Sequence, residues 1–172
     1  MSQQKALSFE CLYEAYSPKV KRLCRLLLKN AAEAEDTGQE IFLKMFKQYQ
    51  TESWPEDWSA WLTRVTVNAC HDRRKSAWWK WWQSCDGEVR LADHPSTDAT
   101  PEQQLAGREE HSRIWSAFRG LPARQQQVFV LRYVEGWSTE QVAETLAITT
   151  GSVKNHLFRA IRSLRARLGD RL

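Results

Sequence analysis

Basic and aromatic side chains are concentrated in residues 71–82, with the sequence HDRRKSAWWKWW. Aromatic rings stack on unpaired nucleic-acid bases while lysine and arginine bind phosphates, and each stacked base contributes about 1–3 kcal/mol. Neighbouring side chains on a helix point in different directions, so one core cannot bury all four tryptophans at positions 78, 79, 81 and 82. We therefore interpret this segment as a candidate surface for single-stranded nucleic acid or for a partner protein.

A second candidate surface lies on the helix that the sequence predicts over residues 150–168. Successive residues of a helix are rotated by about 100°, and this rotation places the apolar residues of 150–168 on one side of the helix and a polar stripe on the other. The stripe consists of Ser152, Asn155, Arg159 and Arg162, with Lys154 at its margin and Phe158 on its flank. Such side chains read base edges in a DNA groove, and a phenyl ring suits a thymine methyl or a neighbouring protein surface. The alternative is an ordinary solvated basic face.

Residue types that catalyse reactions or bind metals are not grouped. The four cysteines (11, 24, 70 and 85) and four histidines (71, 94, 111 and 156) form no metal-ligand spacing, and we interpret the cysteines as small buried hydrophobes. The one dense acidic cluster, Glu33, Glu35 and Asp36, is not matched by a further carboxylate or a nucleophile at a recognisable spacing. We predict no catalytic residues, no metal and no other cofactor.

Three amphipathic helices are predicted in the N-terminal half. Apolar residues recur at spacings of three, four and seven over residues 9–29, about 32–49 and about 57–75. These helices suggest a compact bundle, with the loop QTESWPED between the second and the third.

The C-terminal half predicts a helix-turn-helix. A helix over residues 123–134 has Val128, Leu131 and Val134 inward, and Ser138 to Gln141 form a capping box that opens a short helix. Thr149 can cap the final helix. In this arrangement the second helix of the pair enters the DNA major groove.

Charge divides the 172-residue chain into three parts. The net charge is +3 over residues 1–83, −5 over 84–110 and +6 over 111–172. We predict an all-α protein with a helical bundle (1–83) and a helix-turn-helix domain (112–172) joined by an acidic flexible linker (84–111). Composition alone favours a solvated spacer over an acidic strand that fills a basic channel. Neither a secretory signal nor a membrane-spanning run is visible, which indicates a cytoplasmic protein without membrane insertion.

Five short stretches, in this order and separation, resemble the extracytoplasmic-function group of bacterial sigma factors, the smallest members of the sigma-70 superfamily. They are AEDTGQEIF (34–42), AWLTRVTVN (60–68), LPARQQQVF (121–129), GWSTEQVA (136–143) and TGSVKNHLFRA (150–160). The family's regions 2 and 4 would cover about residues 9–82 and 112–168. Gly38 stands where an aliphatic residue is usual, and the cluster Trp78–Trp82 is richer in tryptophan than expected for the family.

The resemblance implies a sigma factor that binds core RNA polymerase and directs it to promoters, without catalysis of its own. The residues Asp36, Gln39, Glu40 and Phe42 match the helix that docks on the clamp coiled coil of the largest subunit. The loop over 49–57, with Tyr49 and Trp54, and Asn68 would capture a flipped base of the −10 element. Nearby phosphates would be held by Arg73, Arg74 and Lys75.

The resemblance also gives the final helix a role. Its residues Ser152, Lys154, Asn155, Phe158, Arg159 and Arg162 would read the −35 element. The linker would run towards the polymerase active-site channel, in contrast to the spacer that composition favours. The implied partners are core polymerase, including the flap of its second-largest subunit, promoter DNA and an anti-sigma protein.

Two other classes compete with this interpretation. A two-domain helix-turn-helix regulator would bind duplex DNA without polymerase, usually as a dimer on a palindrome. A recombinase or nuclease with a helix-turn-helix tail would need a catalytic constellation, which the sequence lacks. The acidic docking helix and the aromatic-basic stretch favour the sigma factor.

Overall fold

The computed structural model describes residues 8–51, 53–83 and 112–169, and of residues 77–83 the backbone alone. Every regular element in these ranges is a helix, which confirms the all-α prediction. The chain divides into two compact units, Met1–Ala77 and Trp78–Leu172. The predictions for the linker over 84–111, for Cys85 and for the side chains of the Trp78–Trp82 cluster lie outside the described residues.

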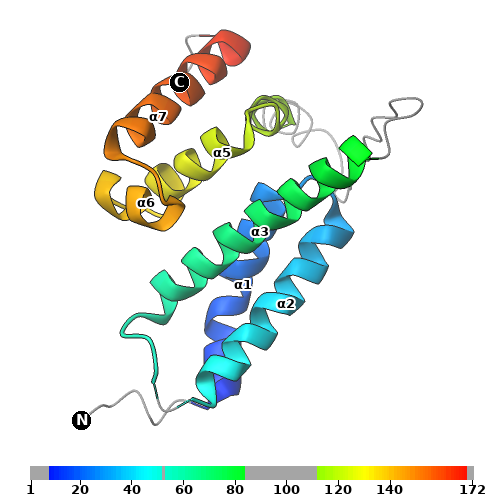
Figure 1. Cartoon of the computed structure of the whole chain (residues 1–172), viewed down its shortest axis with the longest axis vertical. Helices are drawn as coiled ribbons and strands as arrows, with labels where there is room; N and C mark the ends of the chain where they lie inside the picture. The colour runs from blue at the N-terminus through cyan, green and yellow to red at the C-terminus, as the bar shows by residue number, and fades with distance from the viewer. Residues whose placement is uncertain (1–7, 52, 84–111, 170–172) are drawn as a thin grey trace, which may run out of the picture. The chain divides into compact units, whose positions relative to one another are not determined.

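The first unit is a bundle of α1 (Phe9–Leu27), α2 (Ala31–Tyr49) and the part of α3 (Trp58–Gln83) up to Ala77 (Figure 1). The α1 and α2 bounds agree with the prediction within two residues. The helix α3 continues to Gln83, so the predicted end near Lys75 is wrong. The loss of the apolar stripe after Lys75 does not end the helix, because no glycine or proline interrupts residues 76–83.

The core of the bundle is mainly apolar, with Thr37, Thr63 and Thr66 also buried, and α3 is bonded to both neighbouring helices. The fully buried large side chains are Val20, Leu23, Leu27, Ile41, Met45, Leu62 and Val67. At one end, the Lys19 ammonium of α1 donates to the Ser59 hydroxyl at 2.8 Å. At the other, the Arg74 guanidinium donates to the carbonyl oxygen of Leu27 at 3.2 Å, which supplies a partner at the C-terminal end of α1.

Two of the described cysteines belong to this core. Cys24 of α1 and Cys70 of α3 are buried and hydrogen-bonded to each other, and this bond together with burial raises the pKa of the Cys70 thiol. The interpretation of the cysteines as buried hydrophobes is wrong for Cys11, which is exposed near the start of α1. There Ser8 caps the helix, and its hydroxyl also donates to the Cys11 sulfur at 3.4 Å.

The second unit contains a helical segment over residues 112–119, followed by α5 (Ala123–Phe129) and a π-helical turn, η2 (Val130–Val134). The single α-helix predicted over 123–134 is therefore wrong in its second half. The Glu135 amide donates to the Val130 carbonyl oxygen at 3.0 Å, and this wider turn departs from the 3.6-residue period. As a result Val134, which the period places inward, is 40% exposed.

The helix-turn-helix consists of α6 (Thr139–Leu146) and α7 (Thr150–Leu168). The predicted capping box is confirmed, because Ser138 and Gln141 each accept from the other's backbone amide, at 3.1 and 2.8 Å. Thr149 caps α7 through the Ser152 amide at 3.1 Å, as predicted. Helix α7 packs against both α5 and α6, and its buried face comprises Val153, Ala160 and Leu164.

A buried glutamine ties α5 to the preceding segment. The Gln126 side-chain amide is 3.0 Å from the carbonyl oxygens of Phe118, Arg119 and Leu121. These carbonyls lie at and just beyond the end of the 112–119 helix, where the Phe118 carbonyl oxygen also accepts from the Leu121 amide at 3.0 Å. Gln126 thus fixes the approach to α5, although its sequence context, a run of three glutamines, does not single it out.

Candidate partner-protein and nucleic-acid interfaces

The polar stripe of α7 is open to solvent. Four predicted polar residues of this surface, Lys154, Asn155, Arg159 and Arg162, are exposed, and the Phe158 ring is 65% exposed. Ser152 differs, since it is half-buried and its hydroxyl lies 2.9 Å from that of Thr149. The structure therefore brings five of the six predicted residues onto one accessible face and places the sixth in the helix cap.

The positive charge of this face comes from arginine and lysine rather than from histidine. Burial, and next the guanidinium groups of Arg159 and Arg124, lower the pKa of His156 on α7. His156 is therefore neutral at physiological pH. Because Arg159 is exposed and long, it can reach a phosphate or a guanine edge.

The loop between α2 and α3 holds a chain of aromatic rings. The Trp54 indole donates to the Tyr49 carbonyl oxygen at 2.9 Å, and the two ring centroids are 5.0 Å apart. Trp54 also contacts the buried Trp58 at 6.1 Å. The structure thus brings Tyr49 and Trp54 together. Asn68 is exposed on α3, about 15 Å along the helix axis from Trp58.

The three basic residues after Asn68 have different surroundings. Arg73 donates to the Thr37 hydroxyl at 3.2 Å and forms an ion pair with Glu40 at 3.0 Å. Arg74 donates to the end of α1, and burial lowers its pKa. Lys75 is exposed. Two of the predicted phosphate-binding residues are therefore engaged inside the bundle in this structure, whereas Lys75 faces solvent.

The outer face of α2 is acidic in its first half, whereas the exposed Lys44 and Lys47 follow in its second half. Asp36, Gln39 and Glu40 are exposed, whereas Phe42 is half-buried. The Phe42 ring lies 4.7 Å from that of Tyr13 on α1, at an interplanar angle of 61°. Three of the four predicted docking residues thus share an open face, and the fourth lies in the seam between α1 and α2.

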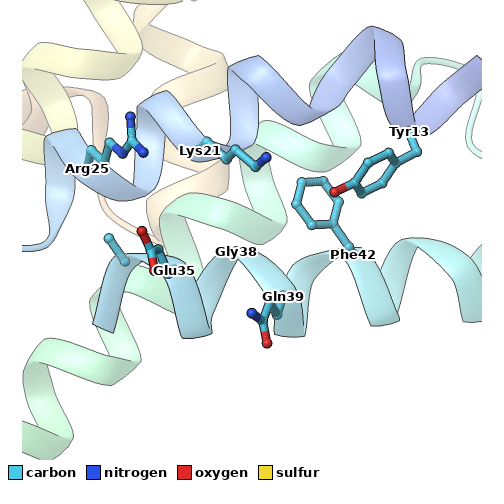
Figure 2. Close-up of a pocket in the computed structure, with 8 residues that line it drawn as sticks. Tyr13, Lys21, Arg25, Glu35, Gly38, Gln39 and Phe42 are labelled. Carbon is cyan, nitrogen blue, oxygen red and sulfur yellow. The ribbon is translucent and has the colours of Figure 1, made fainter. Parts of the chain in front are cut away.

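A pocket of about 280 Å³ lies along this seam (Figure 2). Its lining consists of Tyr13, Lys21, Arg25, Ala34, Glu35, Gly38, Gln39 and Phe42. Gln39 and Phe42 were predicted as site residues, but the α1 side of the pocket was missed. Helical periodicity separates exposed from buried positions and cannot tell which exposed residues flank a neighbouring helix.

Among the described residues, no helix combines the length and apolarity needed to cross a bilayer. In the same ranges, histidine, cysteine and carboxylate side chains do not gather in threes as metal ligands would.

Comparison with known proteins assigns both halves of the chain to described families. Residues 12–80 match "Sigma-70 region 2", and residues 111–164 match "Sigma-70, region 4". The chain is 30% identical over 166 residues to the ECF RNA polymerase sigma factor SigL of Mycobacterium tuberculosis, covering 96% of this chain and 91% of that protein. It is 26% identical over 168 residues to the ECF RNA polymerase sigma factor SigW of Bacillus subtilis, covering 95% and 90% respectively.

A solved structure shares the fold. The sigma factor RpoE, crystallised with the anti-sigma factor NepR from Bartonella quintana, superimposes with a TM-score of 0.71 at 19% identity. The match covers 95% of this chain and 98% of RpoE. At this level of identity the likeness concerns the helical architecture.

Proposed function

The chain belongs to the extracytoplasmic-function group of the sigma-70 family, and from this premise we propose how its residues act in transcription initiation. It is an alternative sigma factor that directs RNA polymerase to promoters. The two-domain regulator is not favoured, because both sigma regions match in order along one chain.

The N-terminal domain, residues 1–83, docks on core polymerase. Asp36, Gln39, Glu40 and Phe42 of α2 bind the clamp coiled coil of the largest subunit. The exposed acidic face of α2 supports this role, because opposite charges steer two surfaces into register. Phe42, half-buried in the seam, contributes an apolar contact at the edge of that face.

The same domain reads and opens the −10 element. Tyr49 and Trp54 form one wall of a base-binding site, and Asn68 contacts the flipped base or its neighbour. The hydrogen bond from the Trp54 indole to Tyr49 supports this assignment, because it fixes the loop before DNA arrives. Flipping requires a few kcal/mol for local unpairing, which contacts in the pocket offset. Lys75 faces solvent and holds a phosphate, and Arg73 and Arg74 join it when they leave their partners in the bundle.

The C-terminal domain, residues 112–172, reads the −35 element with α7. Lys154, Asn155, Arg159 and Arg162 contact base edges and phosphates, Phe158 contacts a thymine methyl, and Ser152 fixes the helix N-terminus. This domain also binds the flap of the second-largest subunit. The linker, residues 84–111, runs towards the active-site channel, and its net negative charge suits a basic channel.

The chain has no catalysis of its own, because polymerase supplies the chemistry. An anti-sigma protein inhibits it, by analogy with RpoE, which was crystallised with NepR. We place it in the cytoplasm, where polymerase and promoters are.

The observation that carries this function is the exposed stripe of α7 on a chain that carries both sigma regions. Run-off transcription with purified core polymerase, with and without this protein, tests it on a pool of promoter fragments from the host. We expect discrete transcripts only when polymerase and protein are both present. A footprint of the protein alone on duplex DNA, without new transcripts, would instead identify a regulator.

A further inference from the structure

Gly38 is a helical glycine that the fold does not require. It lies inside α2, where glycine costs about 1 kcal/mol relative to alanine. Its φ is not positive, so its backbone suits any residue. A Cβ atom built at Gly38 meets no heavy atom within 4 Å. Neither backbone conformation nor packing among the described residues explains why a side chain is missing here.

The missing side chain leaves room in the pocket between α1 and α2. Figure 2 shows Tyr13 and Phe42 at one end of this pocket, Arg25 and Glu35 at the other, and Gly38 between them. The volume of about 280 Å³ is several times the roughly 30 Å³ that one water molecule occupies in the liquid. An aliphatic or aromatic side chain of another protein can therefore enter beside Gly38.

The charges around the pocket differ from one side to the other. Lys21 and Arg25 of α1 are exposed, and within the described ranges neither forms an ion pair. On the other side, α2 presents Asp36 and Glu40. A partner helix that lies over the seam matches these charges when its carboxylates face α1 and its basic residues face α2.

We propose that an apolar side chain of the polymerase helix that docks on α2 inserts into the Gly38 pocket, while a carboxylate of that helix meets Lys21 and Arg25. This inference rests on the proposed function, since Gln39 and Phe42 belong to both the pocket and the docking face. Gly38 then acts as a specificity residue, because it admits a partner side chain that a bulky residue at this position would exclude.

Filling the pocket tests the inference. We compare Gly38→Leu and Gly38→Ala in the full chain, with Ala32→Leu as a control that places a leucine at an exposed site on α2 outside the pocket. We expect both Gly38 variants to melt at or above the wild-type temperature, because alanine and leucine are better helix formers. The dissociation constant for purified core polymerase should rise at least about tenfold for Gly38→Leu, because a filled pocket clashes with the inserted side chain. Ala32→Leu should bind like the wild type.

A charge variant tests the second half of the inference. Arg25→Glu should weaken core binding, and the loss should be smaller at high salt because solvent-exposed charges are screened. If the wild type binds core polymerase and Gly38→Leu binds within about twofold of it, the pocket inference is overturned and the proposed function stands. If the wild type does not bind core polymerase at all, the proposed function fails, and the pocket inference with it. The inference is also overturned if Gly38→Leu loses binding to an inhibitor protein but still binds core polymerase like the wild type.

Discussion

The Arg73 guanidinium donates to the Glu40 carboxylate at 3.0 Å, and this ion pair joins a residue proposed for the −10 surface to one proposed for polymerase docking. Arg73 also donates to the buried Thr37 hydroxyl at 3.2 Å. The Arg73 and Glu40 side chains are 31% and 56% exposed, so solvent screens their attraction. Polymerase would therefore compete for Glu40, and a DNA phosphate would compete for Arg73. The same ion pair also orients α3 on α2.

A double-mutant cycle measures this pair. Arg73→Ala should destabilise the bundle more than Glu40→Ala does, because it also removes the bond to Thr37. The coupling free energy should be about 0.2–1 kcal/mol, as for exposed ion pairs. Urea unfolding of the wild type, both single variants and the double variant gives this value. Equal losses for the two single variants would show that the bond to Thr37 contributes nothing.

Replacement of Lys154 or Arg159 by alanine should weaken promoter recognition with little effect on the fold, because both side chains are exposed. A lost contact to a base edge should reduce the free energy of binding by about 1–3 kcal/mol. Open-complex formation on a matched promoter checks this. Arg113→Ala, which removes one exposed positive charge elsewhere in the same unit, is the control. Unchanged promoter opening in both α7 variants would contradict the groove assignment.

Asn68→Ala should impair promoter opening more than it lowers affinity for the closed duplex. The side chain is exposed on α3 and is proposed to contact only an unpaired base. Permanganate footprinting of unpaired thymines, run beside a duplex-binding assay with the polymerase holoenzyme, separates the two steps. Equal losses in both assays would argue against base capture.

Gln126→Leu should lower the free energy of unfolding of the second unit by about 1–3 kcal/mol, because three carbonyl oxygens lose their side-chain donor. The matched control is Gln125→Leu at the neighbouring half-buried position, where a change within about 0.5 kcal/mol is expected. Denaturant unfolding followed by circular dichroism compares the two. Similar effects would mean that the Gln126 bonds add nothing to stability.

His156 should make the second unit less stable in mild acid. Its pKa is lowered below the ordinary value of 6.5 in the folded state. As the pH falls from 6.5 towards that lower pKa, the unfolded chain binds the proton before the folded chain does. The free energy of unfolding therefore falls as the pH falls through this window. Above the window, the contribution of neutral His156 to stability is fully present. Unfolding curves of the wild type and His156→Gln across the window check this, and identical pH dependence would contradict it.

The bounds and caps of several helices could be predicted from the sequence. Apolar periodicity placed α1, α2 and α7 within two residues, and Ser138 and Thr149 marked the starts of α6 and α7. These features depend on residues within one or two helical turns, where period and capping are set by neighbouring positions. The π turn after Phe129 was not accessible, because it has no distinctive residue pattern. The extension of α3 to Gln83 was missed because the apolar stripe is lost after Lys75, although no glycine or proline interrupts residues 76–83.

Contacts between distant residues were decided by the tertiary structure. The ion pair of Arg73 and Glu40 spans 33 positions, and the Gly38 pocket needs α1 beside α2 before it exists. Sequence indicated that Gly38 was unusual and that Arg73 could bind a phosphate. Only the packing of the helices showed that one opens a pocket and the other is held by α2. Helical period fixes which face of a helix is buried, whereas the partner of each exposed side chain depends on how separate helices pack together.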